Sequence, residues 1–171
     1  MQISIGDVLT TPADVLISTA NPWLNMSGGV NAAIRERDPS IQDELRACLQ
    51  KLDKSAVPAG TVVATSAGNL PFSHILHAVA IDPFYDSSVE IVAATMESAF
   101  TQARALSAHS VSMPTLATGY GHLSVEDFGR ALVRVMAAPP IIQRLTIVVR
   151  STEKADILRR LIDQAQPRPA E

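Results

Sequence analysis

Cysteine, aromatic residues and long apolar runs are scarce in this 171-residue chain. Cys48 is the only cysteine, so no intramolecular disulfide can form, and no Cys/His spacing resembles a metal site. No uninterrupted apolar run approaches the roughly 20 residues that a membrane-spanning helix needs. The N-terminus does not resemble a secretory signal, and we therefore expect a soluble cytoplasmic protein with no metal and no cofactor.

Basic charge is also in short supply. The chain has 14 Lys and Arg against 17 Asp and Glu, which gives a formal net charge of −3. Such a balance provides no overall positive field that could hold a nucleic acid backbone. An anionic ligand would have to be held locally, by backbone N–H groups and helix dipoles.

What the chain does have is the composition and length of one globular domain, with 47% hydrophobic and 18% charged residues. Short β-branched runs alternate with helical periodicity nearly throughout. The runs predict strands at 2–5, 15–19, 61–65, 74–80, 111–113 and 145–149. The periodic stretches predict helices at 30–37, 41–52, 88–105, 124–137 and 154–165.

Strands followed by helices of ten or more residues favour parallel crossovers, with helices on both faces of the sheet. Residues 145–149 are apolar without clear alternation, as expected of a strand buried on both faces. No internal repeat or long linker divides the chain. We expect one domain over residues 1–166, followed by a loose tail at 167–171.

Two glycine-bearing segments leave predicted strands and enter predicted helices. The first, residues 21–31, contains Ser27-Gly28-Gly29 just before a helix. Consecutive glycines let the backbone approach a ligand, and the helix N-terminus offers free N–H groups and a partial positive charge. This combination favours a phosphate, although an ordinary strand-to-helix turn would have the same composition.

The second segment, residues 114–122, contains Thr118-Gly119-Tyr120-Gly121. Open α/β sheets bind ligands where strands lead into helices, at the carboxyl ends of the strands. Two such loops could face each other and hold a diphosphate from both sides.

The order and spacing of these landmarks resemble the macro domain family. That family has an early Gly-Asp-Ile/Val, then Asn-Ala-Ala-Asn, five residues, and Gly-Gly-Gly-Val. This chain has Gly6-Asp7-Val8, then 18–21 reading Ser-Thr-Ala-Asn, five residues, and 27–30 reading Ser-Gly-Gly-Val. Residues 114–121 are similar to the family's second phosphate-holding loop. The likeness spans almost the whole chain, and the first loop is its most specific part.

The resemblance implies a single-domain, three-layer α/β/α sandwich with a mixed, mostly parallel central sheet, and a cleft for ADP-ribose. In that cleft Asp7 would accept a hydrogen bond from adenine, and Asn21 would bond the distal ribose. Tyr120 would cover the distal side, and Arg150 would stack on adenine where relatives often have an aromatic residue. The ligand-binding residues implied are Asp7, Val8, Asn21, Ser27, Gly28, Gly29, Val30, Ala117, Thr118, Gly119, Tyr120, Gly121 and Arg150.

Each role has a plainer alternative. Asp7 could cap a turn or helix, Asn21 could stabilise the turn before Pro22, Tyr120 could be a packing aromatic, and Arg150 could be an exposed strand-end residue. His122 after the second loop could serve as a base, but a loop or surface role is commoner for such a histidine.

Catalysis is less clearly implied than binding. Hydrolytic macro domains usually carry an aspartate after the Gly-Gly-Gly-Val run, where this chain has Asn31. A neutral amide can position water but cannot act as a base. Ser18 replaces a frequent asparagine, and the second loop is one residue shorter.

Three functions therefore remain open. The first is a module that binds ADP-ribose or ADP-ribosylated targets. The second is a hydrolase of O-acetyl-ADP-ribose or of mono-ADP-ribosylated protein, in which Asn21 and Asn31 would place the water. The third is an RNA- or poly-adenine-binding module, which the acidic balance disfavours because partners of that kind need a basic surface.

Overall fold

The computed structural model describes residues 1–140 and 142–165. Within them, six strands form one sheet: β1 (Gln2–Ile5), β2 (Val15–Ala20), β3 (Val62–Ser66), β4 (His74–Val79), β5 (Ser110–Met113) and β6 (Arg144–Val149). The helices are a 3₁₀ turn η1 (Val8–Thr10), α1 (Gly29–Arg37), α2 (Ser40–Lys51), α3 (Val89–Ala105), α4 (Val125–Met136) and α5 (Thr152–Ala165). The expected tail at 167–171 lies outside the described residues.

The sheet has the order β1-β6-β5-β2-β4-β3. All neighbouring strands are parallel except β3, which pairs antiparallel with β4 at one edge. The mixed, mostly parallel sheet predicted above is thus confirmed. β2 lies in the middle, paired with both β4 and β5, so its carboxyl end is surrounded by the ends of other strands.

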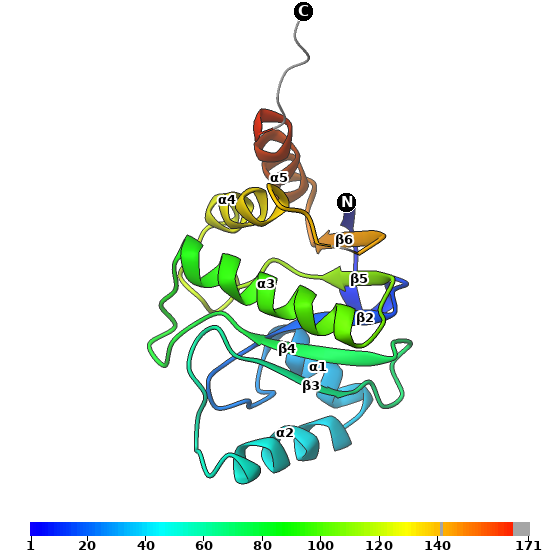
Figure 1. Ribbon diagram of the computed structural model, residues 1–171, viewed down its shortest axis with the longest axis vertical. Coiled ribbons are helices and arrows are strands. Elements are labelled where there is room, and N and C mark those ends of the chain that lie inside the picture. Colours follow the sequence, from blue (N-terminus) through cyan, green and yellow to red (C-terminus); the bar gives the residue numbers. More distant parts are fainter. Residues whose placement is uncertain (141, 166–171) are drawn as a thin grey trace, which may run out of the picture.

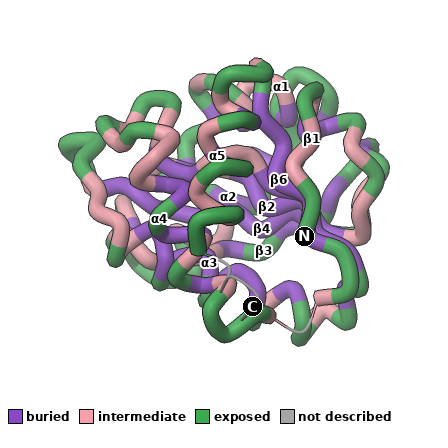
Figure 2. Tube along the Cα trace, turned by 90° about the horizontal axis from the view of Figure 1, so that it is seen from above, coloured by how far each residue is buried: buried purple, intermediate pink, exposed green. Residues whose placement is uncertain are grey.

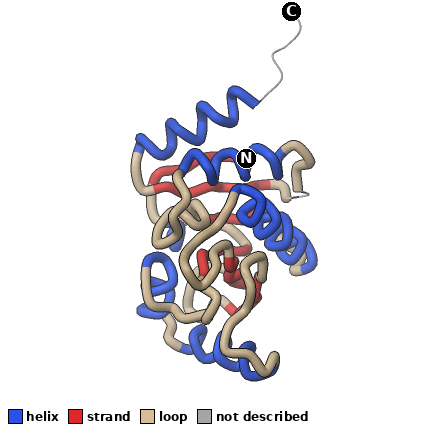
Figure 3. The backbone as a smooth tube through the Cα atoms, turned by 90° about the vertical axis from the view of Figure 1, so that its left-hand side faces the viewer, coloured by secondary structure: helices blue, strands red, loops and turns tan. Residues whose placement is uncertain are grey.

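Helices cover the two faces of the sheet, and Figures 1 and 3 show them outside the strands. Successive residues of a strand point to opposite faces, and this alternation divides the core in two. Val15 and Ile17 of β2 belong to the apolar layer that contains α3, α4 and α5. Leu16 of β2 faces the other layer, with residues of α1 and α2. The buried strands run through the middle of the molecule (Figure 2), which confirms the three-layer sandwich.

Helix boundaries follow the capping signals in the sequence. The Ser88 side chain accepts from Ile91 N at the start of α3, and Ser124 forms a capping box with Asp127 at the start of α4. The first helix ends before Asp38-Pro39, as expected from proline. η1 was not predicted, because a single 3₁₀ turn leaves no periodic pattern.

One histidine of β4 is part of the core. His77 of β4 is fully buried, and burial lowers its pKa to about 4. Its Nε2 is hydrogen-bonded to the Thr65 hydroxyl at 2.9 Å. His77 is therefore neutral near pH 7 and packs as part of the core.

Within residues 1–140 and 142–165, none of the helices combines the length and apolar character needed to cross a membrane.

Candidate functional site

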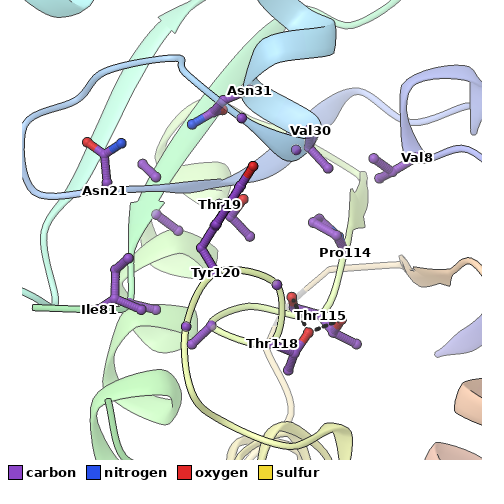
Figure 4. Close-up of a pocket in the computed structure, with 18 of the residues that line it drawn as sticks. Val8, Thr19, Asn21, Val30, Asn31, Ile81, Pro114, Thr115, Thr118 and Tyr120 are labelled. Carbon is purple, nitrogen blue, oxygen red and sulfur yellow. Dashed lines mark hydrogen bonds between the residues drawn. The ribbon is translucent and has the colours of Figure 1, made fainter. Parts of the chain in front are cut away.

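A cleft of about 630 Å³ opens at the carboxyl ends of β2, β4, β5 and β6. This volume is in the range of small-molecule sites. The loop after β2 (residues 21–28) and the loop after β5 (residues 114–124) line it on facing sides, as Figure 4 shows. We call them the first loop and the second loop.

The first loop is held rigidly from inside the molecule. Leu24 and Met26 are buried, and the Gln42 side chain of α2 bonds both of their backbones. Gln42 Nε2 donates to Leu24 O (3.0 Å), and Gln42 Oε1 accepts from Met26 N (2.8 Å). The loop therefore enters α1 in a fixed direction.

The start of α1 is open to the cleft. Its N-cap residue Gly28 makes no side-chain cap, and Gly29 has φ +57°, a conformation that favours glycine. The N–H groups of the first helical turn are consequently available to a ligand, together with the positive end of the helix dipole.

Asn21 and Asn25 close the first loop on itself. Asn21 Nδ2 donates to Asn25 O at 2.8 Å, and Asn21 Oδ1 accepts from Asn25 N at 3.1 Å. Both residues also line the cleft. The Asn21 amide thus stabilises the loop, as the plainer interpretation of this residue expected, while lying beside the cavity.

The second loop is built from small residues and a strained backbone. Ala117 has φ +60°, and a Cβ at Gly121 would collide with the Ala117 carbonyl. The hydroxyls of Thr115 and Thr118 are hydrogen-bonded at 2.7 Å. Left-handed backbone at a non-glycine residue is costly and concentrates at functional sites.

Tyr120 reaches from the second loop to the start of α1 (Figure 4). A methyl group added at Gly28 would come within 2.5 Å of the Tyr120 hydroxyl. The ring is 70% exposed, so it lies across the opening of the cleft rather than in the core. The glycine at position 28 is what allows the two loops to approach.

Asn31 belongs to the first turn of α1, and its side chain is buried, with 6% of the residue exposed. The Ser18 hydroxyl of β2 donates to Asn31 Oδ1 at 2.8 Å. Two of the positions at which the chain departs from the family pattern are therefore bonded to each other. Asn31 also lines the cleft, where its amide is a neutral, positioned polar group.

One end of the cleft, near β1 and β6, is cationic. Gly6, Val8, Val149, Arg150 and Lys154 line it, with Arg150 at the end of β6 and Lys154 in the first turn of α5. The aliphatic side chains offer a surface for a flat ring, and the two cations an attraction for anions.

Asp7 is the one predicted ligand-binding residue that does not line the cleft. Its carboxylate accepts from Leu9 N (3.0 Å) and so caps η1. It also lies 3.6 Å from Arg37 Nη2 and 3.5 Å from Arg150 Nη2. In this structure Asp7 orders the cationic end, and its contact with adenine stays a prediction.

All the other predicted site residues line the cleft: Val8, Asn21, Ser27, Gly28, Gly29, Val30, Asn31, Ala117, Thr118, Gly119, Tyr120, Gly121 and Arg150. Sequence reasoning missed a third loop, residues 80–88 after β4, whose Ile81 and Tyr85 also line it. That loop has no glycine motif. The only available signal was that it follows a predicted strand, at 74–80.

His122 makes two hydrogen bonds to this third loop. Its Nδ1 lies 2.8 Å from Asp86 Oδ1, and its backbone N donates to Tyr85 O at 3.3 Å. His122 does not line the cleft. In the described part of the chain, no group of three or more His, Cys, Asp or Glu side chains is arranged to hold a metal ion.

Known proteins match both the sequence and the fold. The model of the family described as Macro domain matches residues 17–132. A protein of Klebsiella pneumoniae (strain 342) named O-acetyl-ADP-ribose deacetylase is 32% identical, over 94% of this chain and 95% of its own length. A macro domain-containing protein of Streptomyces nogalater is 30% identical, over 94% and 90%.

Solved structures share the architecture at lower identity. A variant of the Oceanobacillus iheyensis macrodomain, solved with ADPR, superposes with a TM-score of 0.86 at 20% identity, covering 95% of this chain and 91% of that one. The Trypanosoma brucei macrodomain in complex with ADP-ribose gives a TM-score of 0.77 at 16% identity, covering 94% and 68%.

Proposed function

This chain belongs to the macro domain family, and from that premise we propose that it binds ADP-ribose in the cleft between the first and second loops. One observation carries the proposal. The uncapped N-terminus of α1 and the glycine-bearing second loop face each other across a cleft of about 630 Å³. Such a site suits a diphosphate held by backbone donors in a protein of net acidic charge.

The lining residues suggest how the ligand lies. Adenine fits the cationic end, between Val8 and the planar guanidinium of Arg150, with Asp7 close enough to contact the adenine amino group after a small shift. The diphosphate lies against residues 27–30 and 117–121. The distal ribose then reaches Asn21, Asn31 and Tyr85 at the other end.

Binding rather than hydrolysis is the function that Asn31 favours. An amide bonded to Ser18 cannot accept a proton from water at neutral pH, and the loss of a general base typically costs about 10² to 10⁴ in rate. We therefore propose a module that recognises ADP-ribose, free or attached to protein. The alternative is a slow hydrolase of O-acetyl-ADP-ribose, which is what the name of the Klebsiella relative suggests.

A glutamate at position 28 tests the proposed phosphate site. Gly28→Glu places a carboxylate where the diphosphate would lie and displaces Tyr120, and it should weaken ADP-ribose binding by at least about 100-fold. Gln50→Glu, on the exposed face of α2, adds the same charge elsewhere and should bind normally. Isothermal titration of both folded variants gives the comparison.

The steric and electrostatic effects separate in a double variant. Adding Tyr120→Ala to Gly28→Glu makes room for the new side chain but keeps its charge, so binding should stay weak. Normal ADP-ribose affinity in Gly28→Glu would show that the first loop does not hold the phosphates.

A further inference from the structure

Aromatic side chains gather at the end of the cleft opposite Arg150. The chain has only seven aromatic residues, four Phe, two Tyr and one Trp. Four of them are exposed: Trp23 (41%), Phe84 (78%), Tyr85 (37%) and Tyr120 (70%). Trp23 lies on the first loop, Tyr120 on the second loop, and Phe84 and Tyr85 on the third loop. We call these four residues the aromatic rim.

The rim is held in place by the surrounding loops. The Trp23 and Tyr85 rings pack with centroids 6.5 Å apart at an angle of 51°. Tyr85 has φ +66°, which a tyrosine adopts only when neighbours impose it. Those neighbours include Asp82, whose carbonyl accepts from Tyr85 N (3.0 Å), and His122, whose backbone N donates to Tyr85 O (3.3 Å). An exposed aromatic pair, of which Tyr85 is kept in a costly backbone conformation, indicates a binding surface.

Among Asp, Glu, Lys and Arg, the three loops that carry the rim contain only acidic residues. Residues 21–28, 80–88 and 114–124 contain Asp82 and Asp86 and no Lys or Arg. Both carboxylates belong to the third loop, where Asp82 Oδ1 accepts from Phe84 N and Asp86 N, and Asp86 Oδ1 bonds His122. The cations Arg150 and Lys154 line the other end of the cleft. One end of the cleft is therefore basic, whereas the third loop beside the other end carries two acidic residues.

We propose that the aromatic rim, with Asp82 and Asp86, binds a Lys- or Arg-containing segment of a protein that carries ADP-ribose. This inference rests on the proposed function, because the rim lies where the distal ribose, the point of attachment to a target, would emerge. Ammonium and guanidinium groups are attracted to the faces of Trp and Tyr, and adjacent carboxylates add to that attraction. The site thus reads both the modification and the basic residues beside it.

A nucleic acid strand fits the same surface less well. Bases stack on aromatic rings, but their phosphates need Lys or Arg nearby, and these loops supply two carboxylates instead.

Four ligands test the inference on the full chain by isothermal titration. They are free ADP-ribose, a serine-ADP-ribosylated peptide with two Arg on each side, the same peptide with Glu in place of Arg, and an oligonucleotide carrying one ADP-ribose. We expect the Arg peptide to bind about five-fold more tightly than free ADP-ribose, and the Glu peptide more weakly than it. The preference should shrink as salt is raised.

Two variants locate the preference. The double variant Asp82→Asn, Asp86→Asn keeps the acceptor oxygens of both side chains and removes both charges, and Trp23→Ala removes a ring that does not line the cleft. Each should lower the ratio of Arg-peptide to Glu-peptide affinity at least threefold, and the double variant should leave free ADP-ribose binding unchanged. Asp43→Asn with Glu97→Gln, two acids on the outer helices α2 and α3, makes the same change of charge elsewhere and should keep the wild-type ratio.

The outcomes separate the two proposals. If free ADP-ribose binds but the peptides bind equally, or the double variant keeps the wild-type ratio, the rim is not a reader of basic residues. Tighter binding of the oligonucleotide than of the Arg peptide would also overturn it. If neither free ADP-ribose nor any peptide binds, the proposed function itself fails.

Discussion

Asn31 and Ser18 form the residue-scale feature on which the proposal of binding without efficient catalysis rests. Asn31 replaces the aspartate usual in hydrolytic macro domains, and Ser18 replaces an asparagine frequent in the family. The structure shows the two bonded through Ser18 Oγ and Asn31 Oδ1 in a buried position. A hydroxyl that donates to residue 31 would also stabilise a carboxylate there. The pocket therefore has the polar partner that an aspartate would need.

Restoring the carboxylate should restore hydrolysis. We expect Asn31→Asp to raise the rate of O-acetyl-ADP-ribose hydrolysis by about 10² or more, because a general base typically contributes about 10² to 10⁴. The rate of acetate release, with ADP-ribose affinity measured in parallel, checks this. The conservative variant Asn31→Gln should hydrolyse no faster than the wild-type protein. An Asn31→Asp protein that binds ADP-ribose but hydrolyses no faster would show that more than this carboxylate is missing.

At the scale of the secondary-structure elements, Asp14 lies just before β2 and links the starts of β2, β4 and β5 by hydrogen bonds. Its Oδ2 accepts from the backbone N of His109 and of Ser110, at 2.8 Å each, beside β5. Its carbonyl accepts from Ser73 N at 2.7 Å, just before β4. The backbone N–H of Ser110, then that of His109, lowers the pKa of Asp14 below its usual 3.8. Asp14 thus aligns β2 with both of its partners, and so fixes where their opposite ends, the cleft, lie.

Removing this carboxylate should destabilise the whole sheet. We expect Asp14→Ala to lower the free energy of unfolding by about 1–2 kcal/mol, at or below the lower end of the range for hydrogen bonds to charged groups, because the carboxylate is partly exposed to solvent. Because the folded pKa is lowered, the stabilisation is complete above the ordinary pKa and is lost as pH falls through the folded one. Urea denaturation at neutral and acid pH measures the difference.

Asp43→Ala is the control, since Asp43 is exposed on α2 and, among residues 1–140 and 142–165, pairs only with Arg46, three residues along. Its effect should stay within about 0.5 kcal/mol. A loss no greater for Asp14→Ala than for this control would show that the strand ends align without it.

At the scale of the whole molecule, periodicity and capping residues predicted most of the fold. The strands at 2–5 and 74–80 and the helices opened by Ser88 and Ser124 are confirmed to within one or two residues, because local sequence determines them. The three-layer sandwich with a mixed, mostly parallel sheet, which the resemblance to the macro domain family implied, is confirmed as well.

The site was predictable only where it had a local pattern. From sequence alone, the glycines and the helix start at 27–30 favour a ligand-binding loop, and in the structure these residues line the cleft. The part played by Tyr85, Lys154 and the Ser18–Asn31 bond depends on which strand ends lie side by side, and no local pattern records that. Asp7 was singled out by its motif as a ligand-binding residue. In the structure it does not line the cleft, but caps η1 and pairs with Arg37 and Arg150.

The most direct test of the account is a calorimetric titration of the wild-type protein with ADP-ribose, with ADP and AMP as controls. The proposed ligand contacts run along the whole cleft, from Arg150 to Tyr85. They predict micromolar binding of ADP-ribose, weaker binding of ADP and weaker still of AMP. They also predict a rise in melting temperature with ADP-ribose concentration, because the ligand binds only the folded state. A folded protein that gives neither heat nor thermal stabilisation with ADP-ribose would contradict the central claim.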